Sequence, residues 1–448
     1  MSTVAFLYVA SRFLLALTFN ELYDLHEVVD CGSMILGGPS RWPTLLSTED
    51  CAKYPPAFHY WSAFLVLVTG GDPLALRLLH VPLEVTTMLG IVVLSATVTP
   101  PGDDARGGAR VRGLASGRTS GSSRQRSLPV FFFAFSPISS FIFVATPFEL
   151  VTPALLTWAL VAHCRDHWAA CGALLTLGSA FEVYPAFVLA FLFVELLATG
   201  RRSSILKFAA GALATAAAIQ LPFIIVLGGG GVLQGFAIHF SRPPRAYSLW
   251  QQFRDWGLWL EADLVTPLGV VPVSLVGVVV VVFGAFTVLG AAKRGKAARY
   301  VSKRESVTAC VVVLLLMQVV FLSIFHRYLL WALAPACALL EPVETRPREF
   351  LAASPLVVLP VLIPNVFVVL LTSLVAWVVL GGRARLSSLE EHRFTLVRAL
   401  TVVAAFATVQ VVVRHLNFQA LVWLLPLTFT VGVVPTVVVV WRLVTLEL

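Results

Sequence analysis

The sequence predicts an all-α, polytopic membrane protein with about 11–14 transmembrane helices. Its 448 residues have a mean hydropathy of +0.87, and 58% of them are hydrophobic whereas only 12% are charged. Soluble globular chains are far more polar than this. Apolar runs long enough to cross a bilayer recur from one end of the chain to the other, and the alternating strands of a transmembrane barrel are absent.

The first apolar segments differ in length and therefore in their expected placement. Residues 4–19 lack the basic stretch and the small-residue cleavage site of a signal peptide, so we expect a retained helix. Residues 57–70 are apolar but short for a span, and we expect them to lie in the membrane interface or to re-enter from the same side. The next full span is predicted at residues 76–98.

A basic loop follows this span and sets the topology. Residues 99–128 are rich in Gly, Ser and Arg and contain six arginines against two aspartates. The positive-inside rule places this loop in the cytoplasm. Its polar composition does not support a core of its own.

The remaining spans alternate across the membrane from this loop onward. Residues 1–340 form the predicted membrane core, and residues 341–448 form C-terminal helices, interrupted early by Pro360 and Pro364. Within the core, we expect the further spans at residues 130–145, 150–163, 168–179, 184–197, 206–227, 267–291, 307–325 and 328–340.

The charged connections fall into two groups. Basic residues gather at 99–128, 165, 201–202, 293–304 and 346–348, which we expect in the cytoplasm. The opposite, outer side receives the connections at 20–56, 146–149, 182–185, 228–266 and 326–328. We interpret the net charge of +8 as topology and expect no nucleic-acid partner. Placing an ionisable side chain at membrane depth costs free energy, so the ionisable residues of the outer connections are functional candidates.

The outer loop at residues 20–56 carries the densest group of candidates. It contains several carboxylates within ten residues, then a glycine turn, then Tyr54-Pro55-Pro56. Cys31 and Cys51 lie in the same loop and either pair or remain free thiols. The cysteines match no metal-binding spacing, and we expect no metal and no cofactor. His59 and His80, which follow the loop, are expected to be packing residues.

Five short motifs lie on the predicted outer side. They are, in chain order, Asp24 and Asp30 with Gly37-Gly38 and Tyr54-Pro55-Pro56; Ser136-Pro137 with Phe148-Glu149; Phe181-Glu182-Val183-Tyr184-Pro185; His239 with Arg242-Pro243 and Ser248-Leu249; and Arg327-Tyr328-Leu329-Leu330-Trp331. Together they resemble the motifs of the GT-C type of membrane glycosyltransferases, which use polyprenyl- or dolichyl-phosphate sugars. The likeness covers residues 1–340.

The resemblance implies transfer of a mannose, or another hexose, from a lipid-phosphate donor to a lipid-linked acceptor, as in GPI-anchor assembly. Asp24 is the expected base, assisted by Asp30. Fixed cations would meet the phosphate leaving group. The expected partners are the donor, the acceptor, membrane lipids and a small accessory membrane subunit. The expected substrate-binding residues are His239, Arg242, Arg245, Glu149, Glu182, Tyr184, Tyr54, His326 and Arg327.

Several positions depart from the family pattern and keep a second interpretation open. Glu182 stands where the family has a lysine, Glu149 replaces an aspartate, and Arg327 replaces a glutamine. The chain also resembles the polytopic, non-catalytic subunit of the GPI transamidase. For either function we favour the endoplasmic reticulum membrane, with the site facing the lumen, over a prokaryotic plasma membrane.

Overall fold

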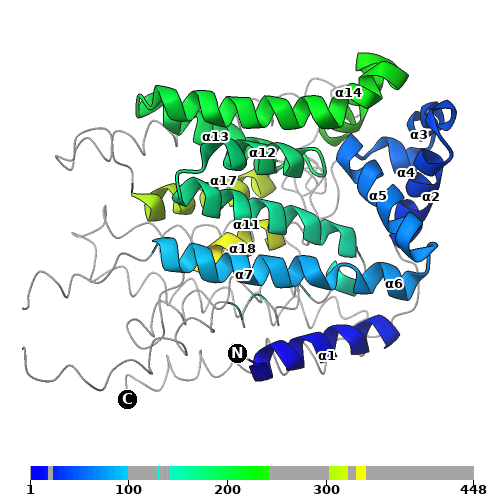
Figure 1. Ribbon diagram of the computed structural model, residues 1–448, viewed down its shortest axis with the longest axis horizontal. Coiled ribbons are helices and arrows are strands. Elements are labelled where there is room, and N and C mark those ends of the chain that lie inside the picture. The colour runs from blue at the N-terminus through cyan, green and yellow to red at the C-terminus, as the bar shows by residue number, and fades with distance from the viewer. Residues whose placement is uncertain are drawn as a thin grey trace, which may run out of the picture.

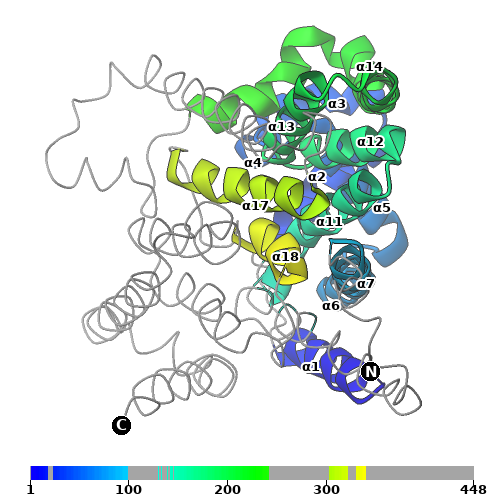
Figure 2. The same cartoon turned by 90° about the vertical axis from the view of Figure 1, so that its left-hand side faces the viewer.

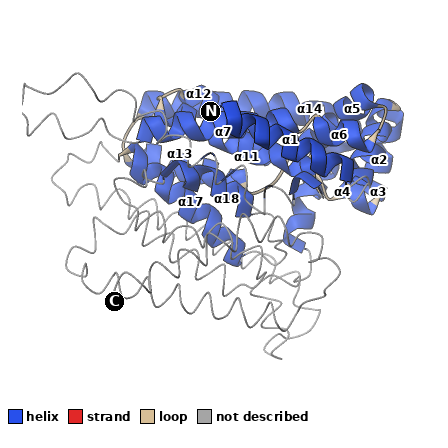
Figure 3. Ribbon diagram, turned by 90° about the horizontal axis from the view of Figure 1, so that it is seen from below, coloured by secondary structure: helices blue, strands red, loops and turns tan. Residues whose placement is uncertain are grey.

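The computed structural model describes residues 2–18, 24–98, 146–241, 302–320 and 329–339, with 130, 133, 139 and 142–144 between them (Figure 1). All regular structure in this part of the chain is helical, and it contains no strand (Figure 3). The all-α prediction is therefore confirmed there. The predicted span at 267–291 and the C-terminal helices after 340 lie outside the described residues.

The helices form close to where the apolar runs predict them. Within the described residues, three segments are long and apolar enough to cross a membrane, namely Pro73–Val98, Pro147–Cys164 and Arg202–Leu233. The helices of this part of the chain are α1 (Ser2–Thr18), α2 (Leu25–Leu36), η1 (Pro39–Arg41), α3 (Trp42–Ser47), α4 (Glu49–Ala52), α5 (Pro56–Thr69), α6 (Pro73–Leu78), α7 (Val81–Val98), η3 (Pro147–Leu150), α11 (Val151–Cys164), α12 (Trp168–Ser179), α13 (Pro185–Ala198), α14 (Arg202–Ser241), α17 (Lys303–Val320) and α18 (Leu329–Leu339).

Local sequence explains several of the helix ends. Ser302 and Glu305 form a reciprocal capping box at the start of α17, each accepting the other's backbone N–H. The Asp72 carboxylate caps α6 by accepting the Ala75 N–H at 2.8 Å. Helices α5 and α13 begin with Pro56 and Pro185, whose missing N–H is not needed in a first turn.

Helix α14 extends beyond the end that the sequence predicts. The expected span stops at residue 227, but α14 continues to Ser241 across a kink at Gly228, whose φ is 72°. Glycine tolerates this left-handed conformation, so the chain bends and resumes as a helix. The predicted outer connection at 228–266 therefore begins inside a helix.

The longer helices form a bundle, and α2 to α5 lie at one end of it (Figure 1). Helix α11 lies inside the bundle and is almost wholly buried, whereas α14 lies along one edge with Leu206, Leu213 and Ile225 exposed (Figures 1 and 2). An edge helix with large exposed apolar side chains is expected where lipid replaces water as the solvent.

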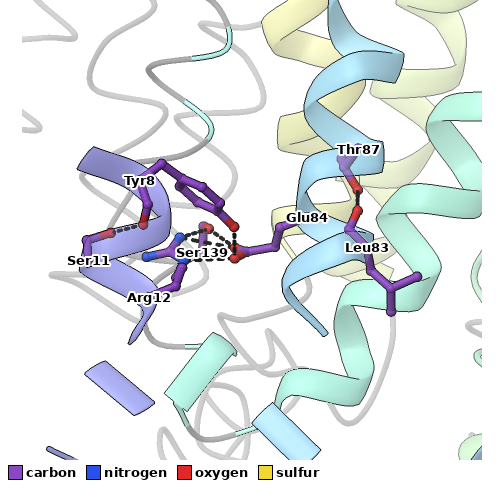
Figure 4. Close-up of polar contacts among 7 residues, drawn as sticks. All are labelled: Tyr8, Ser11, Arg12, Leu83, Glu84, Thr87 and Ser139. Carbon is purple, nitrogen blue, oxygen red and sulfur yellow. Dashed lines mark hydrogen bonds and ion pairs between the residues drawn. The ribbon is translucent and has the colours of Figure 1, made fainter. Parts of the chain in front are cut away.

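A buried ion pair joins the first helix to α7 (Figure 4). The Arg12 guanidinium of α1 donates to Glu84 through Nε at 2.7 Å and through Nη2 at 3.1 Å. Ser139 and the hydroxyl of Tyr8 also donate to the Glu84 carboxylate. Both charged groups are fully buried. Because an unpaired charge in this setting would cost several kcal/mol, the pair specifies how α1 docks.

Helices α12 and α14 approach each other at two glycines. A Cβ atom at Gly211 would lie 2.0 Å from the Ala169 carbonyl oxygen, and one at Gly172 would lie 2.2 Å from the Phe208 carbonyl oxygen. No side chain larger than hydrogen fits against a neighbouring backbone at these distances. The close packing of these two helices therefore depends on both glycines.

We predict that Gly211→Ala destabilises the protein by about 1–3 kcal/mol, because the added methyl group forces the two backbones apart. Gly230→Ala on the same helix is the matched control, since a Cβ there meets nothing within 4 Å. Thermal unfolding of both variants in detergent measures the difference. Equal melting temperatures would contradict the packing argument.

Candidate functional site

The predicted outer loop folds into a compact cap of short helices. The buried face of α2 carries Leu25, Val28 and Cys31. Helix α2 packs against α5. Gly32 permits this contact, because a Cβ there would lie 2.5 Å from the Ser62 carbonyl oxygen. Helix α5 has 14 residues and a length of about 21 Å, which is short for a membrane span.

A disulfide joins Cys31 of α2 to Cys51 of α4, with their Cα atoms 5.6 Å apart. This decides between the two alternatives that the sequence left open. Disulfides persist in oxidising compartments. The pairing therefore agrees with an outer location for this loop, opposite the basic connections.

Glu27 is the centre of the polar contacts in the cap. Its side chain is 7% exposed and forms an ion pair with Lys53, while the Tyr54 hydroxyl donates to its Oε2 at 2.5 Å. Lys53 also lies 3.2 Å from Asp50. Neither Glu27 nor Lys53 was among the predicted site residues. The disulfide brings them together, because Lys53 and Tyr54 lie two and three residues after Cys51 while Glu27 lies one helical turn before Cys31.

Tyr54 connects the cap to a second outer connection. Its ring stacks on Phe58 with the centroids 3.8 Å apart and meets the edge of Phe148 at 5.8 Å. Phe148 and Glu149 belong to η3, which precedes α11, and Glu149 is 2% exposed.

The segment that leads into a third outer connection contacts the start of α5. The Ala57 N–H, at the start of α5, donates to the Ala180 carbonyl at 3.1 Å. Glu182 follows two residues later and is 5% exposed. Residues in or next to three connections predicted to share one side of the membrane, namely Tyr54, Phe148 and Phe181, therefore lie in one apolar cluster. Two buried carboxylates, Glu149 and Glu182, directly follow Phe148 and Phe181 in the chain.

The two aspartates predicted to act together do not lie together. Asp24 is half-buried at the start of α2, and its side chain makes no capping hydrogen bond to the helix. Asp30 is exposed, six residues further along α2, a rise of about 9 Å. Its exposure argues against an assisting role beside Asp24 within this arrangement.

Tyr184 points away from the outer surface. Its ring lies 4.4 Å from that of Trp331 in α18, and it is 2% exposed within the main core. His239 lies in α14, where only the backbone is described. Arg242, Arg245, His326 and Arg327 lie outside the described residues.

One group of side chains in the cap has the composition of a metal site. Ligand atoms of His26, Glu27 and Asp50 all lie within 4.8 Å of one another. However, the Lys53 ammonium already contacts both Glu27 and Asp50. It supplies the positive charge that these carboxylates need, as a cation would.

The two histidines near the cap are buried among apolar groups, as expected. His80 bonds the Leu76 carbonyl through Nδ1 and accepts from Trp61 through Nε2, so both nitrogens are satisfied. His59 stacks on Phe223 at 5.7 Å. Burial lowers the pKa of His59 to about 4, against a smaller opposing effect of the Tyr54 backbone. It is therefore neutral at physiological pH and offers no fixed charge to a phosphate.

Comparison of the chain with protein-family models and with curated proteins found no match in either set.

We predict that Tyr54→Phe destabilises the protein by about 1–3 kcal/mol, because it removes a donor from the buried Glu27 carboxylate. Tyr60→Phe is the matched control. The Tyr60 hydroxyl oxygen is buried and has no hydrogen-bond partner in the described part of the chain, so its loss should be nearly neutral. Urea or thermal unfolding of the two variants gives the comparison, and equal effects would refute the role of the hydroxyl.

We predict that the unfolded, unreduced protein offers four cysteines to maleimide and that reduction adds two more. The four are Cys164, Cys171, Cys310 and Cys337. Replacing both Cys31 and Cys51 with Ser should lower stability by about 3 kcal/mol, since the bridge closes a loop across 20 residues. Intact-mass spectrometry counts the labels, and six labels without reductant would exclude the disulfide.

Proposed function

We propose that the chain is an inverting membrane glycosyltransferase of the GT-C type that transfers mannose from a polyprenyl- or dolichyl-phosphate donor to a lipid-linked acceptor. The packing of residues in or next to three outer connections supports this proposal. Parts of three motifs that are far apart in the sequence, namely Tyr54, Phe148 and Phe181, lie in one apolar cluster at the end of the bundle. A lipid-borne substrate suits a site at the end of membrane-spanning helices.

The reaction needs few protein groups. A carboxylate removes the proton of the acceptor hydroxyl as that oxygen attacks the anomeric carbon, and the bond to the donor phosphate breaks with inversion. Asp24 is the proposed base, since it is half-buried at the start of α2, where the cap begins. Cations from the connection at 228–266, including Arg242 and Arg245, would stabilise the leaving phosphate.

Glu27, Lys53 and Tyr54 have a supporting role in this proposal. Lys53 is held by two carboxylates, so it is poorly placed to bind a donor phosphate. Its contacts instead fix the first turn of α2, which carries Asp24. The disulfide between Cys31 and Cys51 also links α2 to α4, which precedes Lys53 in the chain.

The alternative is a non-catalytic subunit of the GPI transamidase, and one observation favours it. Glu182 is buried where the family has a lysine that would meet the phosphate. A carboxylate at that place repels an anionic donor unless nearby cations compensate for it.

We predict that purified protein transfers mannose from a polyprenyl-phosphate donor to lipid acceptors, and that Asp24→Asn lowers the rate by about 100-fold or more. Asp30→Asn should lower it by less than about threefold, because this carboxylate is exposed to solvent. Thermal unfolding of both variants controls for folding.

The other outcomes separate the two functions. A large loss in Asp30→Asn alone would move the base to Asp30 and keep the enzyme. No transfer by the wild type with any donor, together with co-purification of other transamidase subunits, would exclude the enzyme and support the scaffold.

A further inference from the structure

A buried polar cluster lies at the opposite end of the bundle, where α11, α13 and α17 meet. The Ser306 hydroxyl of α17 donates to Glu195 Oε2 of α13 at 2.6 Å and lies 2.8 Å from His163 Nε2 of α11. Ser306, His163 and Glu195 are 1%, 5% and 7% exposed. One hydroxyl therefore joins side chains from three helices.

The protonation state of Glu195 sets the direction of this chain of hydrogen bonds. When Glu195 is ionised, the single Ser306 proton is donated to it, and His163 Nε2 carries a proton and donates it to Ser306. When Glu195 is protonated, its own O–H can donate to Ser306, which then donates to His163 Nε2. The other nitrogen, Nδ1, is buried and has no hydrogen-bond partner in the described part of the chain. Within the described part of the chain, Glu195 also forms no ion pair.

The nearby cations are already engaged. Arg201 and Lys303 lie 3.7 Å and 3.6 Å from the Asp166 carboxylate, and Lys303 also donates to the Cys164 carbonyl. Arg201, Lys303 and Asp166 act electrostatically on His163, and Arg201 and Glu305 act on Glu195. The other titratable groups around the cluster are Cys164, Cys171 and Cys310.

We propose that His163, Ser306 and Glu195 form a proton-binding site that fastens α17 to α11 and α13 while it holds one proton. A carboxylate and an imidazole together have zero net charge only when they share a single proton. Without that proton the pair carries one negative charge, and with a second proton it carries one positive charge. Burial penalises both charged states.

Gain or loss of a proton therefore loosens the contact between the three helices. Helix α17 packs on α18, which begins at Leu329, directly after the outer connection at 326–328.

The buried cysteines of this region provide native probes. Cys164 follows His163 directly, Cys310 lies one helical turn after Ser306, and both are buried. Cys337 of α18 serves as the reference. The experiment measures N-ethylmaleimide labelling of each cysteine in the folded, full-length protein between about pH 3.5 and about pH 9. Each rate is divided by the rate in the unfolded chain, which removes the effect of thiolate formation.

In the wild type, labelling of Cys164 and Cys310 relative to Cys337 should be slowest at a mildly acidic pH and rise toward both extremes. The rise should reach up to about tenfold per pH unit, as expected when one proton controls opening. Glu195→Gln should abolish the alkaline rise and keep the acid rise. His163→Gln should abolish the acid rise and keep the alkaline rise. Without the imidazole, Glu195 is neutral when it is protonated at low pH and charged when it loses the proton at high pH.

Glu305→Gln is the matched control. It removes a nearby charge, and glutamine can keep the capping box with Ser302, so the wild-type profile should persist. Two outcomes overturn the proposal: a flat wild-type profile, or variants that raise labelling equally at every pH. Since the wild-type profile is decisive by itself, the test does not depend on the variants folding.

Discussion

The need to pair buried charges shapes this structure more than any other constraint. Arg12 meets Glu84, Lys53 meets Glu27, and Glu195 shares a hydroxyl with His163. Each contact joins segments that are far apart in the sequence. Apolar packing alone permits many helix arrangements, because a hydrophobic surface has no preferred partner. An ionisable group in the same environment has few acceptable neighbours, so it selects one arrangement.

The outer cap and the bundle have separate cores that meet at the candidate site. Val28, Phe58 and Phe148 belong to the cap core, whereas Tyr184 and Trp331 belong to the core of the bundle. The disulfide and the glycine contact between α2 and α5 hold the cap together, and residues of the bundle such as Phe181 and Phe223 complete its core. A site between two such bodies gains precise geometry from the rigidity of each.

The sequence predicts helix positions well because length and apolar continuity determine them. The segment at 168–179 matches α12 residue for residue, whereas the continuation of α14 past Gly228 was missed because glycine runs normally end a helix. The exposure of Asp30 was predictable, since Leu25, Val28 and Cys31 define the buried face of α2. The pairing of Glu27 with Lys53 was not, because it depends on which cysteines pair and on how the loop closes.

The balance of carboxylates and cations at the outer end bears on the choice between the two proposed functions, because only the glycosyltransferase has to bind a phosphate donor. Glu149 and Glu182 add buried carboxylates at this end, while Lys53 is neutralised by Glu27 and Asp50. A phosphate donor approaches such a place only if other cations outweigh the carboxylates. The arginines of the connection at 228–266 are the available source, and α14 leads toward them past the Gly228 kink. Under the proposed function, the arginines that follow the kink would therefore have to outweigh these carboxylates for an anionic lipid to bind.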